Sequence, residues 1–142
     1  IVIKDFNGKK FLIGHGDGLG PGETSYKMLK AFFSSKICQW AFARIHPNLG
    51  IGIANAWSRK SRKSNITYEE VFHGEDKEKL IIYCKETIKK DPSIDYFIFG
   101  HRHLPLEIKI GEKAKYINLG EWIKYNSYGV FDGEKFELKE FK

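Results

Sequence analysis

The sequence predicts a mixed α/β (α+β) fold in which a β-sheet packs against helices. The chain opens with two short strand-like runs, its middle part carries helical periodicity, and its last third alternates short strands with glycine-containing turns. Its 142 residues, of which 42% are hydrophobic and 15% aromatic, are sufficient for one hydrophobic core. This composition excludes an intrinsically disordered protein.

The first predicted elements are a hairpin and a glycine-rich loop. Residues 1–3 and 11–13 are apolar strand-like runs, and Asn7-Gly8 between them favours a tight turn with positive φ. The second run leads into residues 14–22, where five of the nine residues are glycine. Such a loop allows the backbone to approach another group closely.

Helical patterns follow over residues 23–33, 36–45 and 51–62, with Pro47 ending the second helix and a polar linker over 64–67. The second helix is apolar around more than one stripe, and two interpretations stay open. It is either a buried helix, or a helix whose outer face meets lipid chains or a membrane surface. The residues concerned are Ile37, Trp40, Ala41, Phe42 and Ile45. No apolar run approaches about 18 residues, so a membrane-spanning helix is not predicted.

The second half of the chain predicts one helix and a series of strands. Residues 76–90 form an amphipathic pattern that Asp91-Pro92 ends, and residues 95–99 fit a buried strand. Turns are predicted at Gly111-Glu112 and Asp132-Gly133. The further strands are expected over residues 106–110, 115–119, 127–131 and 136–138.

Positive charge is concentrated in one segment. The chain has a formal net charge of +6, whereas residues 22–63 alone sum to +7 and contain Glu23 as their only acid. A local excess of this kind favours an anionic partner, such as phosphate, nucleic acid or lipid headgroups. A solvated helix face would give the same pattern, so charge by itself leaves both interpretations open.

Three histidines follow the ends of predicted strands. His15 comes after the run 11–13, and His101 and His103 come after the run 95–99, each through a glycine. Ligands of open α/β sheets bind beyond the carboxyl ends of the strands, so we expect these imidazoles to converge. The i, i+2 spacing of His101 and His103 suits two neighbouring metal ions. The other histidines, predicted to be ordinary surface or capping residues, are His46 and His73.

The blocks Gly14-His15-Gly16-Asp17 and Gly100-His101-Arg102-His103 resemble the last two signature blocks of the calcineurin-like metallophosphoesterases. Within that superfamily the sequence is similar to the UDP-2,3-diacylglucosamine hydrolases, the pyrophosphatases of lipid A biosynthesis. The similarity extends through the helices after residue 22, a basic turn at 57–63 and Asn-Leu-Gly-Glu-Trp at 118–122. It covers essentially the whole chain, but only the second half of the family's domain.

The resemblance implies a partial metallophosphoesterase β-sandwich flanked by helices. Residues 1–142 are then the C-terminal portion of a single domain, and residues 22–64 are a basic and apolar helical insertion, or lid. The implied reaction is metal-dependent hydrolysis of the diphosphate of UDP-2,3-diacylglucosamine, giving 2,3-diacylglucosamine 1-phosphate and UMP. Two divalent cations are implied, with Mn²⁺ as the expected ion. The implied location is cytoplasmic and peripheral on the bacterial inner membrane.

The resemblance also implies roles for individual residues. His15 and His101 would ligate one metal and His103 the other, with His101 and His103 as the catalytic pair. Asp17 would orient a ligating histidine or contact the sugar, or else it is an Asx-turn residue of the loop. The residues expected to bind phosphate oxygens are Arg59, Lys60, Ser61, Arg62 and Lys63. Those expected to line an acyl-chain slot, or simply to pack within the lid, are Phe32, Phe33, Ile37, Trp40 and Phe42.

The sequence departs from the family in lacking its three earlier blocks, Asp-x-His, Gly-Asp and Gly-Asn-His. Three histidines are too few donors for a two-metal centre. Because the chain also lacks an initiator methionine, we expect a C-terminal fragment that is inactive alone, or else a relic. Two other functions stay open: a metallophosphoesterase acting on another phosphate ester, and a non-catalytic basic module that binds anions or membrane. Motifs of nucleic-acid-binding modules are absent from the sequence, and no nucleic-acid partner is expected.

Overall fold

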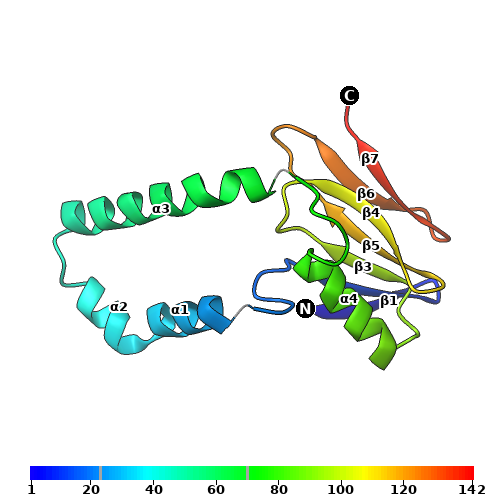
Figure 1. Ribbon diagram of the computed structural model, residues 1–142, viewed down its shortest axis with the longest axis horizontal. Coiled ribbons are helices and arrows are strands. Elements are labelled where there is room, and N and C mark those ends of the chain that lie inside the picture. The colour runs from blue at the N-terminus through cyan, green and yellow to red at the C-terminus, as the bar shows by residue number, and fades with distance from the viewer. Residues whose placement is uncertain (23, 70) are drawn as a thin grey trace. The chain divides into compact units, whose positions relative to one another are not determined.

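The computed structural model describes residues 1–22, 24–69 and 71–142, without the side chains of residues 25, 26 and 60–69 (Figure 1). The chain divides into two compact units. The sheet unit consists of Ile1–Pro21 and Glu69–Lys142, and the helical unit consists of Gly22–Tyr68. Each unit is described by itself below.

The sheet unit contains a five-stranded mixed sheet in the order β1-β2-β3-β5-β4. The three central strands, β2, β3 and β5, run parallel to one another, and β1 and β4 pair antiparallel at the two edges. The predicted α+β class is therefore confirmed. The strands are β1 (Val2–Phe6), β2 (Lys9–Gly14), β3 (Tyr96–Phe99), β4 (Pro105–Ile110) and β5 (Ala114–Leu119).

The hairpin at the start of the chain forms as predicted. Asn7 has a φ of 51° and Gly8 a φ of 75°, the left-handed values that a tight two-residue hairpin turn requires. The amide of Gly8 also donates to the Oδ1 atom of Asp5 at 3.0 Å. These local preferences place β2 beside β1 and direct its carboxyl end into the glycine-rich loop.

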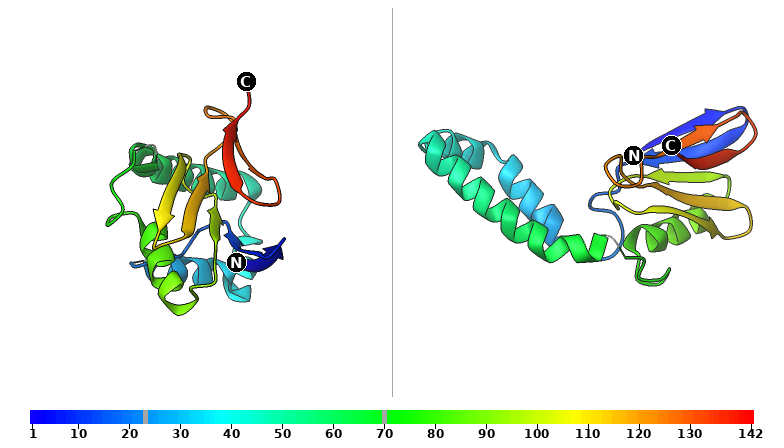
Figure 2. Two further views of the ribbon diagram at one scale, coloured as in Figure 1. Left: turned by 90° about the vertical axis from the view of Figure 1, so that its right-hand side faces the viewer. Right: turned by 90° about the horizontal axis from the view of Figure 1, so that it is seen from above.

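Both faces of the central strand β3 are covered, which explains why its sequence is apolar throughout (Figure 2). Phe97 and Phe99 point to the face that α4 (Lys79–Lys90) covers, where Leu80, Ile81 and Cys84 are buried. The opposite face carries the second hydrophobic cluster, in which β3 contributes Tyr96 and Ile98. Covering it is the β6–β7 hairpin, β6 (Ser127–Phe131) and β7 (Phe136–Glu140).

The helix predicted over 76–90 is confirmed with a later start, at Lys79. Its buried residues are Leu80, Ile81 and Cys84. Burial raises the pKa of the Cys84 thiol, so this cysteine is held as a neutral apolar side chain. The turns at residues 111–113 and 132–134 join the later strands close to the predicted boundaries.

The helical unit contains α1 (Thr24–Ser34), α2 (Lys36–Phe42) and α3 (Pro47–Glu69). Ser35 caps α2 because its side chain accepts from the amide of Cys38 at 3.2 Å. Two predictions need correction. Pro47 begins α3, at the first helical position where its missing N–H is not needed, and does not end the preceding helix. The polar linker predicted at 64–67 is wrong, because α3 continues as one helix to Glu69.

The interpretation of the second helix as a buried one is also wrong. Every residue of α2 is described, and none of them is buried. Ile37 is 79% exposed, Trp40 59% and Phe42 53%. The reason is that α2 is only seven residues long and packs against α1, its neighbour in sequence, without a sheet face to cover it within the unit. No helix in the described part of the chain combines the length and hydropathy needed to cross a bilayer.

Candidate functional site

The ends of β2 and β3 bring two of the predicted histidines together. Gly14 of β2 pairs with Phe99 of β3 in parallel register, so the residues that follow leave the sheet at the same edge. The rings of His15 and His101 are 5.4 Å apart between centroids, at an interplanar angle of 79°. The Gly100 amide donates to the carbonyl of His15 at 3.1 Å and ties the two loops to each other. The structure therefore brings His15 and His101 together, while their role as ligands stays a prediction.

The glycine-rich loop lies close to its neighbours, as its composition predicts. Gly16 has a φ of 113°, and a Cβ atom there would lie 3.2 Å from the Cβ of His101 and 3.0 Å from the Leu80 side chain. Gly20 has a φ of 85°, and a Cβ atom there would collide with the main-chain carbonyl of Lys79. The loop that carries His15 is thus seated against the start of α4 and against the loop of His101.

The loop after β3 has an unusual backbone conformation. His101 has a φ of 56°, in the left-handed region that costs a residue with a Cβ atom about 1–2 kcal/mol. Asn118, a fully buried residue of β5, donates from its amide nitrogen to the carbonyl of Arg102 and, at 2.8 Å, to that of Leu104. These bonds hold the backbone on both sides of His103. Asn118 belongs to the Asn-Leu-Gly-Glu-Trp block, whose resemblance to the family was noted without a role for this residue.

Arg102, between the two histidines, points inward. It is only 5% exposed, whereas His101 and His103 are both exposed. Its Nη2 atom lies 3.0 Å from Oε1 of the buried Glu78 and 2.6 Å from the carbonyl oxygen of Val71. The sequence pattern predicts no role for Arg102 or Glu78. The loop is not extended at His101, so strand alternation could not predict which of its side chains turns inward.

Glu121 is a further residue without a predicted role. Partial burial opposes ionisation of its carboxylate, but backbone amides outweigh that effect and, with the nearby His103, lower the pKa of Glu121. The donors are the amides of Ile123 at 2.6 Å, Lys124 at 2.7 Å and Tyr125 at 3.1 Å. Glu121 therefore places a fixed negative charge close to His103.

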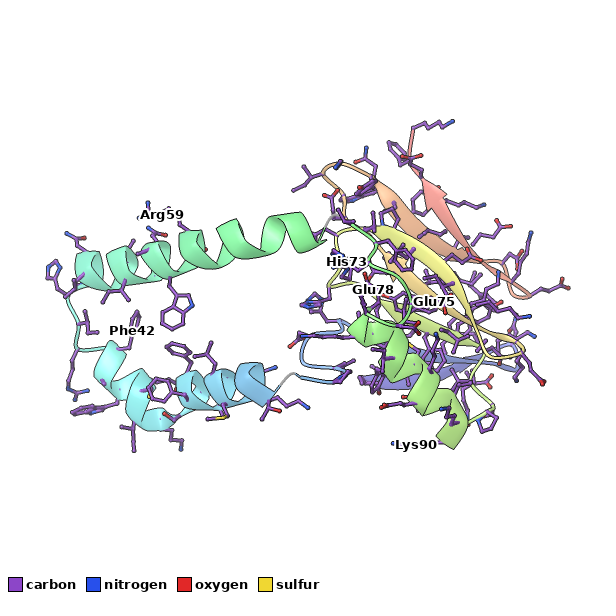
Figure 3. The ribbon with its side chains drawn as sticks, viewed as in Figure 1. Phe42, Arg59, His73, Glu75, Glu78 and Lys90 are labelled. Carbon is purple, nitrogen blue, oxygen red and sulfur yellow. The ribbon has the colours of Figure 1, made fainter. Side chains whose placement is uncertain are left out.

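The remaining predicted site residues fall into three groups. Asp17 is half-buried in the glycine-rich loop, and both of its predicted roles stay predictions. Arg59 is exposed on α3 and points away from α1 and α2, whereas Phe42 of α2 points toward α3 (Figure 3). The basic turn predicted at 57–63 is instead part of the helix α3. The side chains that lie outside the described ones are those of Lys60, Ser61, Arg62 and Lys63.

The two histidines predicted to be ordinary residues have structural partners. His46 accepts from the amide of Asn48 through Nδ1 at 3.3 Å, at the start of α3, which confirms a capping role. His73 is half-buried, and its backbone amide donates to Oε1 of Glu78 at 3.3 Å. Both His73 and Val71, which precede α4, are therefore bonded to the Glu78–Arg102 pair.

The donors at the paired histidines fit part of a metal shell. Imidazole nitrogen suits divalent first-row ions, and the edge-to-face arrangement leaves both rings at one exposed place. Among the side chains that the structure describes, however, no group of three or more from His, Cys, Asp or Glu is close enough to hold a metal ion. His15 and His101 therefore fit as two ligands of a larger set.

The helical unit contains an apolar pocket of about 560 Å³, a size typical of small-molecule sites. Phe33 of α1 and Trp57 of α3 meet across it edge to face, with ring centroids 5.8 Å apart. Of the five predicted acyl-slot residues, Phe32, Phe33 and Phe42 line the pocket, whereas Ile37 and Trp40 lie elsewhere. The full lining is Phe32, Phe33, Cys38, Gln39, Ala41, Phe42, Ile45, Ile53, Ala54, Trp57 and Ser58.

Comparison with known proteins supports the resemblance seen in the sequence. No protein-family model matches the chain. Among curated proteins, a UDP-2,3-diacylglucosamine hydrolase of Porphyromonas gingivalis is 32% identical over 152 residues, which covers 99% of this chain and 58% of that protein. Proteins of the same name from Shewanella pealeana (24% identical) and Blochmanniella floridana (30% identical) match 96% and 92% of this chain, and 55% and 53% of their own lengths. The chain thus spans little more than half the length of the curated relatives it matches.

Proposed function

We propose that this chain, a relative of the UDP-2,3-diacylglucosamine hydrolases over nearly its whole length, is part of an enzyme of that activity. The proposed reaction cleaves the diphosphate of UDP-2,3-diacylglucosamine into UMP and 2,3-diacylglucosamine 1-phosphate. The pairing of His15 with His101, each in a Gly-His block at the end of neighbouring parallel strands, carries the proposal. In this proposal residues 1–142 are the C-terminal portion of one metallophosphoesterase domain, and residues 22–64 are its lid.

The proposed enzyme uses two divalent cations, with Mn²⁺ as the physiological ion. His15 and His101 are the proposed ligands of one ion and His103 of the other. The remaining donors are proposed to lie in a part of the enzyme that corresponds to the region of the relatives that this chain does not match. When bound, such ions act as Lewis acids that stabilise negative charge on phosphoryl oxygens. The chain itself orients the imidazoles, through the Gly100 amide on the His15 carbonyl and through Asn118 on the backbone around His103.

Positive charge in the helical unit is proposed to bind the diphosphate of the substrate. Arginine can contact phosphate oxygens in a bidentate manner, and lysine supplies point charge. Arg59 is exposed and accessible to an anion. We propose the same role for Lys60, Ser61, Arg62 and Lys63, and for Asp17 a contact to the sugar or to a ligating histidine.

The apolar pocket of the helical unit is proposed to take an acyl chain, because most of its lining residues are aromatic or aliphatic. The outer surface of the same unit also exposes apolar side chains, including Met28 (70%), Ile37 (79%) and Ile51 (60%). The Arg44 guanidinium lies 3.6 Å from the centroid of the Trp40 ring, which places a cation beside an exposed aromatic. We propose that this surface rests on the cytoplasmic face of the inner membrane.

The proposal is tested with the full natural protein, by measuring UMP release from UDP-2,3-diacylglucosamine with Mn²⁺ and after chelation. Turnover that requires metal and falls when both acyl groups are removed from the substrate is the expected result. Equal kcat/KM for the acylated and deacylated compounds would indicate a metallophosphoesterase with another substrate. If the protein bound the substrate without metal, with an affinity that falls steeply as salt rises, and did not turn it over, it would be a basic anion- or membrane-binding module.

A further inference from the structure

The loop that carries His101 and His103 is anchored by a buried ion pair. Arg102 extends from this loop to Glu78, whose side chain is 3% exposed, and the two are 3.0 Å apart between Nη2 and Oε1. Glu78 is the residue directly before α4 and accepts a further bond from the amide of His73. Because α4 is packed into the core through Leu80 and Ile81, Glu78 is a rigid point of attachment.

A second attachment comes from β5. Asn118 in β5 binds the carbonyl oxygens of Arg102 and Leu104, while the Arg102 amide donates to the carbonyl of Gly100 at 2.6 Å. The loop is therefore held through a side chain toward α4 and through its main chain toward β5. His101, directly before Arg102, has a φ of 56°, a left-handed value that is uncommon for a residue with a Cβ atom.

We propose that the buried Glu78–Arg102 ion pair positions the histidines of the site. It holds the backbone of residues 100–104 so that His101 adopts its left-handed conformation and faces His15. Arg102 and Glu78 are positioning residues, because their charged groups point inward, away from the exposed imidazoles. The metal-binding part of this inference rests on the proposed function. The geometric part, the contact between His15 and His101, does not.

Replacing the pair together gives the sharpest test. A single Arg102→Met change leaves an uncompensated buried carboxylate and strongly destabilises a fold, whereas exchange of a whole buried pair for apolar residues is often neutral or stabilising. The variant is therefore Glu78→Leu with Arg102→Met in the full natural protein. The matched control is Glu107→Leu with Lys115→Met, which removes the exposed 2.6 Å ion pair between β4 and β5 without touching the loop.

Two measurements are made on each protein. In histidine-labelled protein without metal, a nuclear Overhauser effect between the rings of His15 and His101 reports their contact. The protein is also titrated with Mn²⁺ alone, and electron paramagnetic resonance measures the concentration of free Mn²⁺, which gives the Mn²⁺ affinity. In the Glu78/Arg102 variant we expect a melting temperature close to that of the natural protein, loss of the ring–ring effect and a 10- to 100-fold weaker Mn²⁺ affinity, the range typical for outer-shell partners of metal ligands. The control should retain both signals.

A folded Glu78/Arg102 variant that keeps the ring–ring effect and the Mn²⁺ affinity would overturn the proposal and leave the ion pair a structural role only. If the natural protein shows the ring–ring effect but binds no Mn²⁺, the proposed function fails, and the positioning role is decided by the ring–ring effect alone. Should the double variant not fold, Glu78→Gln with Arg102→Met leaves neither charge buried alone and keeps an acceptor oxygen for the His73 amide. The same two measurements on that variant then decide.

Discussion

Replacing Gly20 with alanine tests whether the glycine-rich loop is seated against α4. A Cβ atom at Gly20 would collide with the carbonyl of Lys79, the first residue of the helix. That carbonyl belongs to the helix backbone and cannot turn aside as a flexible side chain would. The change therefore adds a steric penalty to the conformational one that the φ of 85° imposes.

The expected loss of stability combines the conformational penalty, a partial offset from the unfolded chain, and the steric penalty. A left-handed φ costs a residue with a Cβ atom about 1–2 kcal/mol. Loss of glycine's freedom in the unfolded chain offsets about 0.4–1 kcal/mol of this. Forcing an extra methyl group into a packed contact costs about 1–3 kcal/mol more. We expect Gly20→Ala to lower the free energy of unfolding by roughly 2–3 kcal/mol, a large part of the about 5–15 kcal/mol of an ordinary domain.

Gly8→Ala is the matched control. Gly8 has a similar φ of 75°, but no heavy atom lies within 4 Å of the Cβ position, so only the conformational penalty applies. Its expected cost is about 0.5–1 kcal/mol. Urea unfolding of the full natural protein and both variants, followed by circular dichroism, gives the midpoints and slopes needed. Equal losses for the two variants would refute the seating of the loop on α4.

Three further predictions concern activity, the pocket and pH. His103→Ala should abolish turnover in the full natural protein while the circular dichroism spectrum stays unchanged. Phe33→Ala should lower kcat/KM for the acylated substrate about 10-fold or more, by removing a lining ring, and leave the deacylated compound unaffected. Asp95→Asn should lower the melting temperature at neutral pH by a few degrees, and the difference should shrink as the pH falls below about 4.

The sign of the pH effect follows from the partners of Asp95. Burial opposes ionisation of this carboxylate, but the amide of Lys10 at 2.9 Å and the Lys113 ammonium at 3.2 Å lower its pKa below the ordinary value. A lowered folded-state pKa means that the ionised form contributes stability above the unfolded-state pKa. That contribution is lost as the pH falls through the folded-state pKa.

Each of these predictions has a result that contradicts it. Near-normal turnover of the His103→Ala protein with unchanged metal content would remove His103 from the site. An equal effect of Phe33→Ala on both substrates would mean that the ring only packs the helical unit. A melting difference for Asp95→Asn that persists undiminished in acid would show that packing, and not charge, accounts for the loss.

The sequence by itself determined the elements whose causes are local. Asn7-Gly8 specifies the hairpin because its two residues accept the positive φ that the turn requires. The continuous apolar run at 95–99 predicts a strand buried on both faces, and the periodicity of the run at 76–90 predicts a helix with one buried face. Gly-His at the ends of two such strands was enough to predict that His15 and His101 converge, because parallel neighbours end at one edge of a sheet.

Other features were decided by tertiary structure. Whether α2 is buried depends on what covers it, and an apolar helix in the sequence does not state its partner. Glu78 and Arg102 are 24 residues apart, and only the packing of α4 beside β3 brings a carboxylate and a guanidinium to 3.0 Å at a buried position. Burial makes that pairing obligatory, since either charge alone would be too costly to bury. The sequence thus identified the histidines of the candidate site, and the tertiary structure revealed the ion pair that holds their loop in place.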